Sequence, residues 1–448
     1  MSAGERREGP PRASSAPSGL SPAAPDVPAH IGTGRRAAAS GSGTSSAARA
    51  ASAVVDAKPV TSVGAPILPG ATLGVMGGGQ LGRMFVQAAQ SMGYFTVVLD
   101  PDASSPAGLV SHYHLLADYL DAAALAQLAQ RCDAITTEFE NVPAPALRQL
   151  AAQRRVSPDA DAVAIAQDRA REKAHFVACG VPCAPHAVIE TAAQLAAVSE
   201  ALLPGILKTA RLGYDGKGQI RVTTRAELAA AWAELGNAPC VLEKMLALKA
   251  ECSVIVARGL DGAMVHFPVQ RNLHQGGILA VTEVYEENVS PALARSAVEA
   301  TESIANGLQY VGVMCVEFFV LQDDSLVVNE MAPRPHNSGH YTIDACDLSQ
   351  FDLQLRTLTG LPLVAPRQHS PAIMLNLLGD LWFPSGDEAV APPWRELLAL
   401  PGAHLHLYGK QQARRGRKMG HLTITGASVA QARATAQQAA RQLGLDAF

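Results

Sequence analysis

Apolar residues recur along the chain at two spacings, and the mixture of spacings changes from region to region. Between residues 72 and 160, short apolar runs such as "TLGVM" and "FTVVL" alternate with stretches in which apolar residues return every three or four positions, as from Leu81 to Met92. Buried strands that alternate with amphipathic helices are typical of a parallel sheet covered by helices. The pattern therefore predicts an α/β, Rossmann-like parallel-sheet domain over residues 67–165.

The pattern becomes less regular after residue 165 and predicts an α+β region. Helices are expected at 160–179, 192–202 and 291–307, strands at 206–208, 220–223 and 241–244, and a hairpin at 311–330. The last part predicts strands at 371–378, 404–408 and 421–425 and a helix at 429–443. We therefore expect a central domain over residues 166–365 and a small β-rich C-terminal domain over 366–448.

Composition limits the class of protein. The chain of 448 residues is 48% hydrophobic and carries a formal net charge of −4, which fits about two to three folded domains and argues against a nucleic-acid partner. Its seven cysteines contain no CxxC pair, as is typical of a reducing compartment. No apolar run reaches the roughly 18 residues that cross a bilayer. We expect a cytoplasmic protein with no membrane partner.

Residues 1–66 are rich in Ala, Ser, Pro and Gly and show no hydrophobic periodicity. Because such a segment has too little apolar surface to bury, we predict that it is disordered. Two interpretations remain open. A dispensable extension or a mis-assigned start is favoured, since the segment lacks a convincing amphipathic helix, but the excess of arginine over acids also fits an organelle transit peptide.

The first glycine-rich stretch is "GVMGGGQLGRM", in which Gly77, Gly79 and Gly82 follow a strand and open a helix. This spacing favours a tight turn whose helix N-terminus attracts an anion. Asp100, 18 positions after Gly82 at the end of the next strand, could bind a ribose hydroxyl. Taken alone, the stretch indicates a nicotinamide dinucleotide site.

The predicted hairpin brings two acidic residues together. If Gln322–Ser325 form the turn, Leu321 pairs with Leu326, and counting outward places Glu317 directly opposite Glu330. Like charges opposed on adjacent strands are destabilising unless a cation lies between them, and paired carboxylates suit Mg²⁺. The alternative is that one glutamate lies on a solvated face or that the register is slipped by one residue.

A second glycine-rich stretch, "ILKTARLGYDGKGQIRV", lies between two predicted strands. It places Lys208 at the end of the first strand and Gly213, Gly216 and Gly218 in the loop. It is not a Walker A motif, because Lys217 is followed by glycine and a strand. The loop could fold its N–H groups over phosphates, with Lys208 as a point charge, or it could be a flexible hairpin loop.

The linked motifs resemble the ATP-grasp superfamily, in which two α+β subdomains hold ATP between them. They are "GGGQLGRM", "TEFENVP", "AQDRAREK", "GYDGKGQ", "NLHQGGI", "NEMAPRPHNSGHYT" and "GRKMGHL". More narrowly, the chain is similar to the N5-carboxyaminoimidazole ribonucleotide synthase family of purine biosynthesis, from about Leu73 to the last helix. In that family the first glycine turn seats a substrate nucleotide, so Asp100 becomes the end of an ordinary strand.

The resemblance implies a set of functional residues. The ATP site would contain Arg169, Lys208, Gly213, Tyr214, Asp215, Gly216, Lys217, Gly218, Gln219, Glu243, Lys244, Met245, Leu246, Glu251, His274, Asn329 and Glu330. Glu317 and Glu330 would hold Mg²⁺, with Mn²⁺ as an alternative. The nucleotide substrate would meet Gln80, Glu140, Tyr214, Asp215, Arg334, His336, Asn337, Ser338, Arg414, Arg417 and Lys418. Arg334, His336 and Lys208 are the implied catalytic residues.

One position departs from the superfamily pattern. Many ATP-grasp enzymes carry a metal-binding asparagine two residues after the second glutamate, where this chain has Ala332. The third protein ligand of the metal is therefore in doubt, and water or a phosphate oxygen could take its place.

The implied reaction is ATP-dependent carboxylation of 5-aminoimidazole ribonucleotide with bicarbonate, and the implied assembly is a homodimer. Three alternatives were weighed. They are another purine-pathway ATP-grasp ligase or transformylase, a nicotinamide-dependent oxidoreductase, and a nucleotide-binding regulatory module without catalysis. The pair of glutamates with Lys208 favours the carboxylating ligase over the last two alternatives.

Overall fold

The computed structural model describes residues 64–211, 213 and 218–448. The predicted extension, residues 1–66, lies outside this range except for its last three residues, and Tyr214, Asp215, Gly216 and Lys217 lie outside it as well. No helix in the described part of the chain is both long enough and apolar enough to span a membrane.

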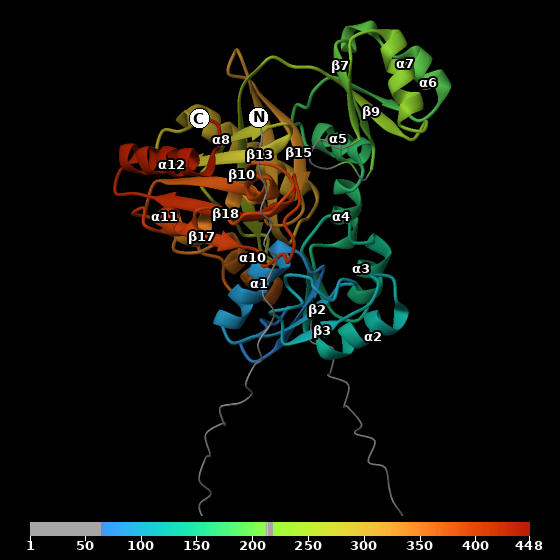
Figure 1. Cartoon of the computed structure of the whole chain (residues 1–448). Coiled ribbons are helices and arrows are strands. Elements are labelled where there is room, and N and C mark those ends of the chain that lie inside the picture. Colours follow the sequence, from blue (N-terminus) through green and yellow to red (C-terminus); the bar gives the residue numbers. More distant parts are fainter. Residues whose placement is uncertain (1–63, 212, 214–217) are drawn as a thin grey trace, which may run out of the picture. The chain divides into compact units, whose positions relative to one another are not determined.

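The N-terminal region forms the predicted parallel sheet (Figure 1), with strand order β3-β2-β1-β4-β5. Its strands are β1 (Thr72–Met76), β2 (Phe95–Leu99), β3 (Tyr113–Leu115), β4 (Ala134–Thr137) and β5 (Arg155–Ser157). Its helices are α1 (Gln80–Ser91), α2 (Ala122–Arg131) and α3 (Ala144–Ala151). The strand residues Leu73, Val75, Val98 and Ile135 are fully buried, as expected for a sheet covered on both faces.

The first glycine turn is filled by carboxylates of the chain itself. Helix α1 has no capping side chain of its own. Instead Glu138, just after β4, accepts hydrogen bonds from the backbone N–H groups of Gly79 (2.9 Å) and Gly82 (3.2 Å). Asp100 accepts one from Gly78 at 2.7 Å. The anion seat of this turn is thus occupied internally, and Asp100 is a buried hydrogen-bond acceptor rather than the end of an ordinary strand.

A linker and a small antiparallel sheet follow. The helix predicted over 160–179 is two helices, α4 (Ala160–Ala166) and α5 (Arg169–Ala178), because Asp168 caps a new helix through the N–H groups of Ala170 and Arg171. The sheet has the order β6-β9-β7-β8. It comprises β6 (His186–Ile189), β7 (Gly205–Thr209), β8 (Gln219–Val222) and β9 (Cys240–Lys244), with α6 (Ala192–Ala197), η1 (Glu200–Leu202) and α7 (Arg225–Glu234).

Helix α7 was absent from the sequence prediction. Its apolar positions are mostly alanine, so they give only a weak periodic signal. The Thr224 side chain accepts a hydrogen bond from Glu227 N–H and caps the helix, and Leu228 and Ala231 are its buried residues. The helix therefore forms on good propensity and a good cap rather than on a strong apolar stripe.

A nine-stranded sheet forms the rest of the molecule, in the order β15-β14-β10-β12-β13-β16-β18-β17, with β11 paired to β10. The strands are β10 (Leu248–Arg258), β11 (Met264–His266), β12 (Gln270–Gln275), β13 (Ile278–Val284), β14 (Gly312–Leu321), β15 (Leu326–Ala332), β16 (Ala372–Leu378), β17 (Ala403–Leu407) and β18 (Lys418–Thr425). The remaining helices are α8 (Pro291–Gly307), η2 (Asn337–Gly339), α9 (Thr342–Ala345), α10 (Gln350–Thr359), η3 (Gly379–Trp382), α11 (Trp394–Leu398) and α12 (Val429–Leu443).

The C-terminal strands continue the central sheet instead of forming one of their own. Strand β16 pairs antiparallel with β13, and Thr282 lies opposite Met374. The C-terminal region is β-rich as predicted, with α12 packed on β16 and β18. The predicted boundaries at 66/67, 165/166 and 365/366 stay predictions.

Helix α10 connects the two large sheets. Its residues Phe351 and Leu355 lie in one apolar core with Met84 and Phe85 of α1. On another face of α10, the fully buried Gln350 bonds to the segment that follows β15. This helix therefore fixes the carboxyl end of β15 relative to the N-terminal sheet.

The internal carboxylate at the glycine turn leads to a stability prediction. Glu138→Leu removes the acceptor of two helix N–H groups, and each buried donor left unpaired costs about 1–3 kcal/mol. We expect the free energy of unfolding in urea to fall by about 2–4 kcal/mol. Glu138→Gln keeps one acceptor oxygen and should lose less. Equal stability of Glu138→Leu and the wild type would contradict the capping role.

Candidate active site

The two glutamates of the hairpin face each other as predicted. Glu317 of β14 lies directly opposite Glu330 of β15. The predicted pairing of Leu321 with Leu326 is wrong, because Leu326 pairs with Val320. A bulge at Asn329 inserts one residue and restores the expected pair. The one-residue error in the predicted turn and the one-residue bulge therefore cancel, so Glu317 and Glu330 lie opposite each other as predicted.

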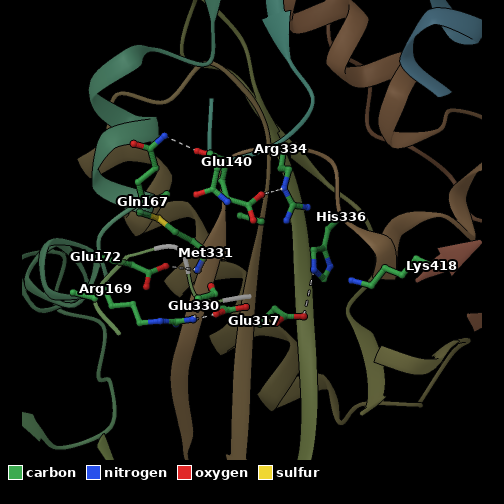
Figure 2. A pocket seen from close by; sticks show the side chains of 15 residues that line it. Glu140, Gln167, Arg169, Glu172, Glu317, Glu330, Met331, Arg334, His336 and Lys418 are labelled. Carbon is green, nitrogen blue, oxygen red and sulfur yellow. Dashed lines mark hydrogen bonds and ion pairs between the residues drawn. The ribbon is translucent and has the colours of Figure 1, made fainter. Parts of the chain in front are cut away.

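The carboxylate pair lies beside an arginine and two histidines in a polar cavity (Figure 2). Arg169 Nη1 lies 3.2 Å from Glu330 Oε2. His336 Nε2 lies 3.6 Å and His274 Nε2 lies 4.0 Å from Glu317 Oε1. Burial, and then the neighbouring Glu330, raise the pKa of Glu317 to about 7.

The donor atoms of this pair fit a hard divalent cation. Glu317 Oε1 is buried and has no hydrogen-bond partner among the described residues. An oxygen left unpaired in the interior is costly unless something binds it. Two opposed carboxylates with one such oxygen are the ligands that Mg²⁺ or Mn²⁺ takes in proteins.

The cavity brings together residues from the N-terminal, central and C-terminal regions of the described chain. It is lined by Glu140, Asn141, Ala166, Gln167, Arg169, Glu172, Ala210, Gly213, Glu317, Glu330, Met331, Ala332, Arg334, His336 and Lys418. Figure 2 shows the ammonium group of Lys418 directed toward the His336 ring. Arg169 also donates to the backbone oxygen of Gly213 at 3.3 Å. The second glycine-rich loop therefore begins close to the Glu317–Glu330 carboxylate pair.

Arg334 and Glu140 form an ion pair across the cavity. The Arg334 Nε donates to Glu140 Oε2. Burial alone would raise the pKa of Glu140, but the Arg334 guanidinium outweighs it and holds the pKa below its usual value. Gln167 donates to the backbone oxygens of Glu140 (2.6 Å) and Val142 (2.7 Å) and so holds the loop after β4. This glutamine was not a predicted site residue.

The backbone of His336 is held at both ends by one side chain. Gln350 Oε1 accepts from His336 N–H at 2.9 Å, and Gln350 Nε2 donates to His336 C=O at 2.8 Å. A Cβ on Gly339 would lie 2.5 Å from the same Oε1, so this position needs glycine. Gln350 was missed by the sequence analysis because its partner lies 14 residues away in a loop.

The His336 ring is neutral in this setting. Burial, and then the Arg334 guanidinium, hold its pKa well below the usual value. Its Nδ1 lies 2.9 Å from Ser338 Oγ, which in turn lies 2.9 Å from Ser253 Oγ. Neither polar atom of the Asn337 side chain has a partner within the described part of the chain, although the residue is buried. His336 and Asn337 thus keep polar atoms available for a ligand.

Lys208 is bound to a carboxylate away from this cavity. Its Nζ lies 3.0 Å from Glu243 Oε2, and Lys173 Nζ lies 3.1 Å from Glu243 Oε1. Burial alone would raise the pKa of Glu243, but the two ammonium groups outweigh it and lower the pKa. Lys173 is only 1% exposed and was not predicted as a site residue, although it lies in the quoted motif "AQDRAREK".

Glu251 and His274 line a second cavity. His274 Nδ1 lies 2.5 Å from Glu251 Oε2. Burial lowers the pKa of His274, but the hydrogen bond to Glu251 and the charge of Glu317 outweigh it and raise the pKa. This cavity also contains Arg271, Glu283 and Arg433. Of the predicted ATP residues, Arg169, Gly213 and Glu330 therefore line the first cavity, and Glu251 and His274 line the second.

Several predicted residues lie elsewhere. Gln219 pairs with Lys208 across β7 and β8, and Gly218 has a positive φ of 68° in the same turn. The described site predictions that line neither of these two cavities are Gln80, Lys208, Gly218, Gln219, Glu243, Lys244, Met245, Leu246, Asn329, Asn337, Ser338, Arg414 and Arg417. Arg414 and Arg417 both bond to Gln412 within their own exposed loop, at 3.1 and 3.0 Å. The roles assigned to these residues and to the undescribed Tyr214–Lys217 stay predictions.

Comparison with known domains defines the class of protein. Residues 174–351 match the ATP-grasp domain, and residues 70–167 match the ribonucleotide synthetase preATP-grasp domain. Residues 372–435 match the phosphoribosylaminoimidazole carboxylase C-terminal domain. The chain is an ATP-grasp enzyme, that is, an ATP-dependent ligase.

Relatives that match most of the chain identify the family within this class of enzyme. The N5-carboxyaminoimidazole ribonucleotide synthase of Brucella melitensis is 44% identical over 358 residues, which cover 79% of this chain and 96% of that protein. The Staphylococcus aureus synthetase complexed with ADP superimposes with a TM-score of 0.77 at 38% identity, covering 84% of this chain and 98% of that one. The chain belongs to the N5-carboxyaminoimidazole ribonucleotide synthase family.

A further relative was solved with a substrate. The Aspergillus clavatus synthase in complex with ADP and 5-aminoimidazole ribonucleotide has a TM-score of 0.76 and 34% identity, and the match covers 84% of this chain and 98% of that one.

The raised pKa of Glu172 predicts how the stability of the fold depends on pH. Its Oε1 accepts from Met331 N–H at 2.7 Å, and burial, followed by the charge of Glu330, raises its pKa from 4.5 to about 8. A raised carboxyl pKa stabilises the fold at low pH, and this contribution is lost as the pH rises through about 8. Without metal or nucleotide, the thermal midpoint of the wild type should fall more between pH 5 and about 8 than that of Glu172→Gln. Parallel curves would contradict the assignment.

Gln350 predicts a loss of turnover without a loss of nucleotide binding. Gln350→Leu frees the backbone of His336, and a misplacement of about 1 Å can cost roughly 100-fold in rate. We expect kcat for ATP-dependent ADP release to fall roughly 10- to 100-fold while KM for ATP changes little. Gln354→Leu, one turn along α10 and bonded to Thr136 instead of His336, is the matched control. Equal loss in both variants would indicate general loosening of α10.

Proposed function

We propose that this chain uses ATP and bicarbonate to carboxylate the exocyclic amine of 5-aminoimidazole ribonucleotide, producing N5-carboxyaminoimidazole ribonucleotide, ADP and phosphate in purine biosynthesis. The observation that carries the proposal is the opposed pair of Glu317 and Glu330, with a buried carboxylate oxygen that accepts no hydrogen bond from the described residues, beside Arg169, Arg334 and His336. The Aspergillus clavatus relative, which binds ADP and 5-aminoimidazole ribonucleotide, supports the choice of substrates.

ATP is proposed to bind with its phosphates toward the carboxylate pair. Mg²⁺ held by Glu317 and Glu330 would neutralise charge on the phosphate oxygens. Arg169, already 3.2 Å from Glu330, is placed to bind a phosphate oxygen as well. Lys208 would exchange its bond to Glu243 for a phosphate, and residues 213–219 are proposed to contribute to the ATP site. Glu251 and His274, in the second cavity, belong to the proposed nucleotide side.

The first chemical step is transfer of the γ-phosphoryl group to a bicarbonate oxygen, which gives ADP and carboxyphosphate. Arg334 would bind the bicarbonate oxygens, because a guanidinium matches a planar oxyanion. Its partner Glu140 holds it in place from the far side. Catalysis in this step is mostly positioning and charge stabilisation.

In the second step carboxyphosphate breaks its bond between carbon and the bridging oxygen, leaving CO₂ and phosphate. The amine of the ribonucleotide then attacks CO₂, and a proton leaves the nitrogen. Burial and Arg334 keep the ring of His336 unprotonated, and an unprotonated imidazole is the form that could accept this proton. An enclosed cavity favours attack by the amine over loss of CO₂ to water.

The ribonucleotide is proposed to enter beside Lys418. Lys418 lines the cavity opposite Arg169 and, with Arg414 and Arg417 of the same loop, can bind the ribose 5′-phosphate. Asn337 offers an amide with no partner among the described residues. Gln80 and Ser338 remain further candidates for substrate contact.

The first glycine turn argues against the alternative function, a nicotinamide-dependent oxidoreductase. A dinucleotide pyrophosphate would need the N–H groups of the first glycine turn, and Glu138 accepts those of Gly79 and Gly82. We also propose a homodimer in the cytoplasm. The cytoplasmic location is supported by the seven cysteines, none of which forms a disulfide in the described part of the chain.

The test is an ADP-release assay with 5-aminoimidazole ribonucleotide, with glycinamide ribonucleotide, and with neither, each with and without bicarbonate. We expect full turnover only when 5-aminoimidazole ribonucleotide and bicarbonate are both present. Full turnover on glycinamide ribonucleotide, or none on any substrate, would overturn the proposal.

The metal assignment is tested by Glu330→Gln in the same assay. A bound metal contributes several kcal/mol to the transition state, so we expect a loss of about 100-fold or more while circular dichroism remains native. Asp323→Asn in the exposed hairpin turn is the matched control, since its carboxylate bonds only within its own turn. Full activity of Glu330→Gln would refute the metal assignment.

A further inference from the structure

A cluster of imidazoles lies outside the cavity described above, on the strand pair β17–β18. His406 of β17 lies directly opposite His421 of β18. Asp344, in the short helix α9 that follows the "HNSGHYT" segment, completes the cluster. None of these three residues has a role in the proposed reaction.

The three side chains have the spacing of metal ligands. One nitrogen of each histidine and one oxygen of Asp344 lie within 4.8 Å of one another. His406 Nε2 lies 2.9 Å and 3.2 Å from the two carboxylate oxygens of Asp344. These are the distances that separate neighbouring ligand atoms around one small ion. His404 Nδ1 lies 3.7 Å from Asp344 Oδ1, but His404 is outside this group of three.

Hydrogen bonds within the cluster join His406 to Asp344, but they leave one ring nitrogen of His421 without a hydrogen-bond partner among the described residues. His421 is fully buried, and its Nε2 has no hydrogen-bond partner in the described part of the chain. Its Nδ1 lies 3.0 Å from the buried hydroxyl of Tyr408. A ring with one nitrogen held by an outer partner and the other nitrogen free is the usual arrangement of a metal-binding histidine.

The rings of His406 and His421 are nearly parallel, at 11° and 4.5 Å between centroids. One ring must therefore turn about χ2 when an ion binds, and that torsion has broad minima.

We propose that Asp344, His406 and His421 form a binding site for a divalent transition metal of the Zn²⁺ class. Two imidazoles and one carboxylate match the ligand preference of Zn²⁺, whereas Mg²⁺ prefers oxygen alone. The ion joins α9 to β17 and β18. Strand β18 begins at Lys418, which lines the active cavity, so the ion would hold the position of that residue.

This site is independent of the proposed reaction, and its test does not use activity. The full chain, free of any histidine tag, is stripped with a chelator and titrated with Co²⁺, whose visible absorption reports tetrahedral nitrogen and oxygen ligands. We expect about one equivalent to bind with visible bands. Asp344→Asn and His421→Gln should each lower the Co²⁺ affinity roughly tenfold or more.

Two controls separate this site from others. His266→Gln removes an exposed imidazole on β11, and Glu330→Gln removes a carboxylate of the active cavity. Both should keep the Co²⁺ bands. If His421→Gln fails to fold, Asp344→Asn carries the test, because an asparagine retains an acceptor for His406.

A second readout is thermal stability. Zn²⁺ in molar excess over the protein should raise the thermal midpoint of the wild type and of Glu330→Gln but not that of Asp344→Asn. The reason is that a metal stabilises only the folded state that binds it. The proposal is overturned if the wild type shows no Co²⁺ bands, or if Asp344→Asn binds Co²⁺ as tightly as the wild type. Either result would mean that the cluster is a plain histidine–aspartate hydrogen bond.

Discussion

The structure depends on one unfavourable contact, the opposition of Glu317 and Glu330 across β14 and β15. Two carboxylates in a largely buried place repel each other and lose water, which is why the pKa of Glu317 rises to about 7. Arg169 offsets part of this repulsion at 3.2 Å. Glu317 Oε1, which is buried and accepts no hydrogen bond from the described residues, makes the site receptive to a metal ion. The repulsion between the two glutamates therefore destabilises this part of the free protein, and a bound cation would relieve it.

Elsewhere, buried charges are paired within the chain. Glu138 fills the N-terminus of α1, and Glu243 is bound by two lysines. Charges left unpaired in the interior are strongly destabilising, so each pairing fixes the elements that carry it. At the first glycine turn Glu138 already accepts the backbone N–H groups, whereas Glu317 Oε1 accepts no hydrogen bond from the described residues. The proposed phosphate site is therefore beside the carboxylate pair.

The sequence predicts local features well and long-range polar contacts poorly. The parallel sheet, helix α8 and the opposed glutamates follow from periodicity and counting, which depend on neighbours in the chain. The bulge at Asn329 was not predictable from that count, yet it cancelled the error in the turn. Helix α7 was missed because alanine gives little periodic contrast. Gln350 and Lys173 were missed because their partners come from other elements, and no local pattern marks them.

The account rests on transfer of a phosphoryl group to bicarbonate beside the carboxylate pair. The most direct test is to run the reaction with ¹⁸O-labelled bicarbonate and to measure the label in the released phosphate by mass spectrometry. If carboxyphosphate forms and then breaks between carbon and the bridging oxygen, each phosphate should carry a single ¹⁸O atom. Phosphate without label, formed while the carboxylated ribonucleotide accumulates, would contradict the account.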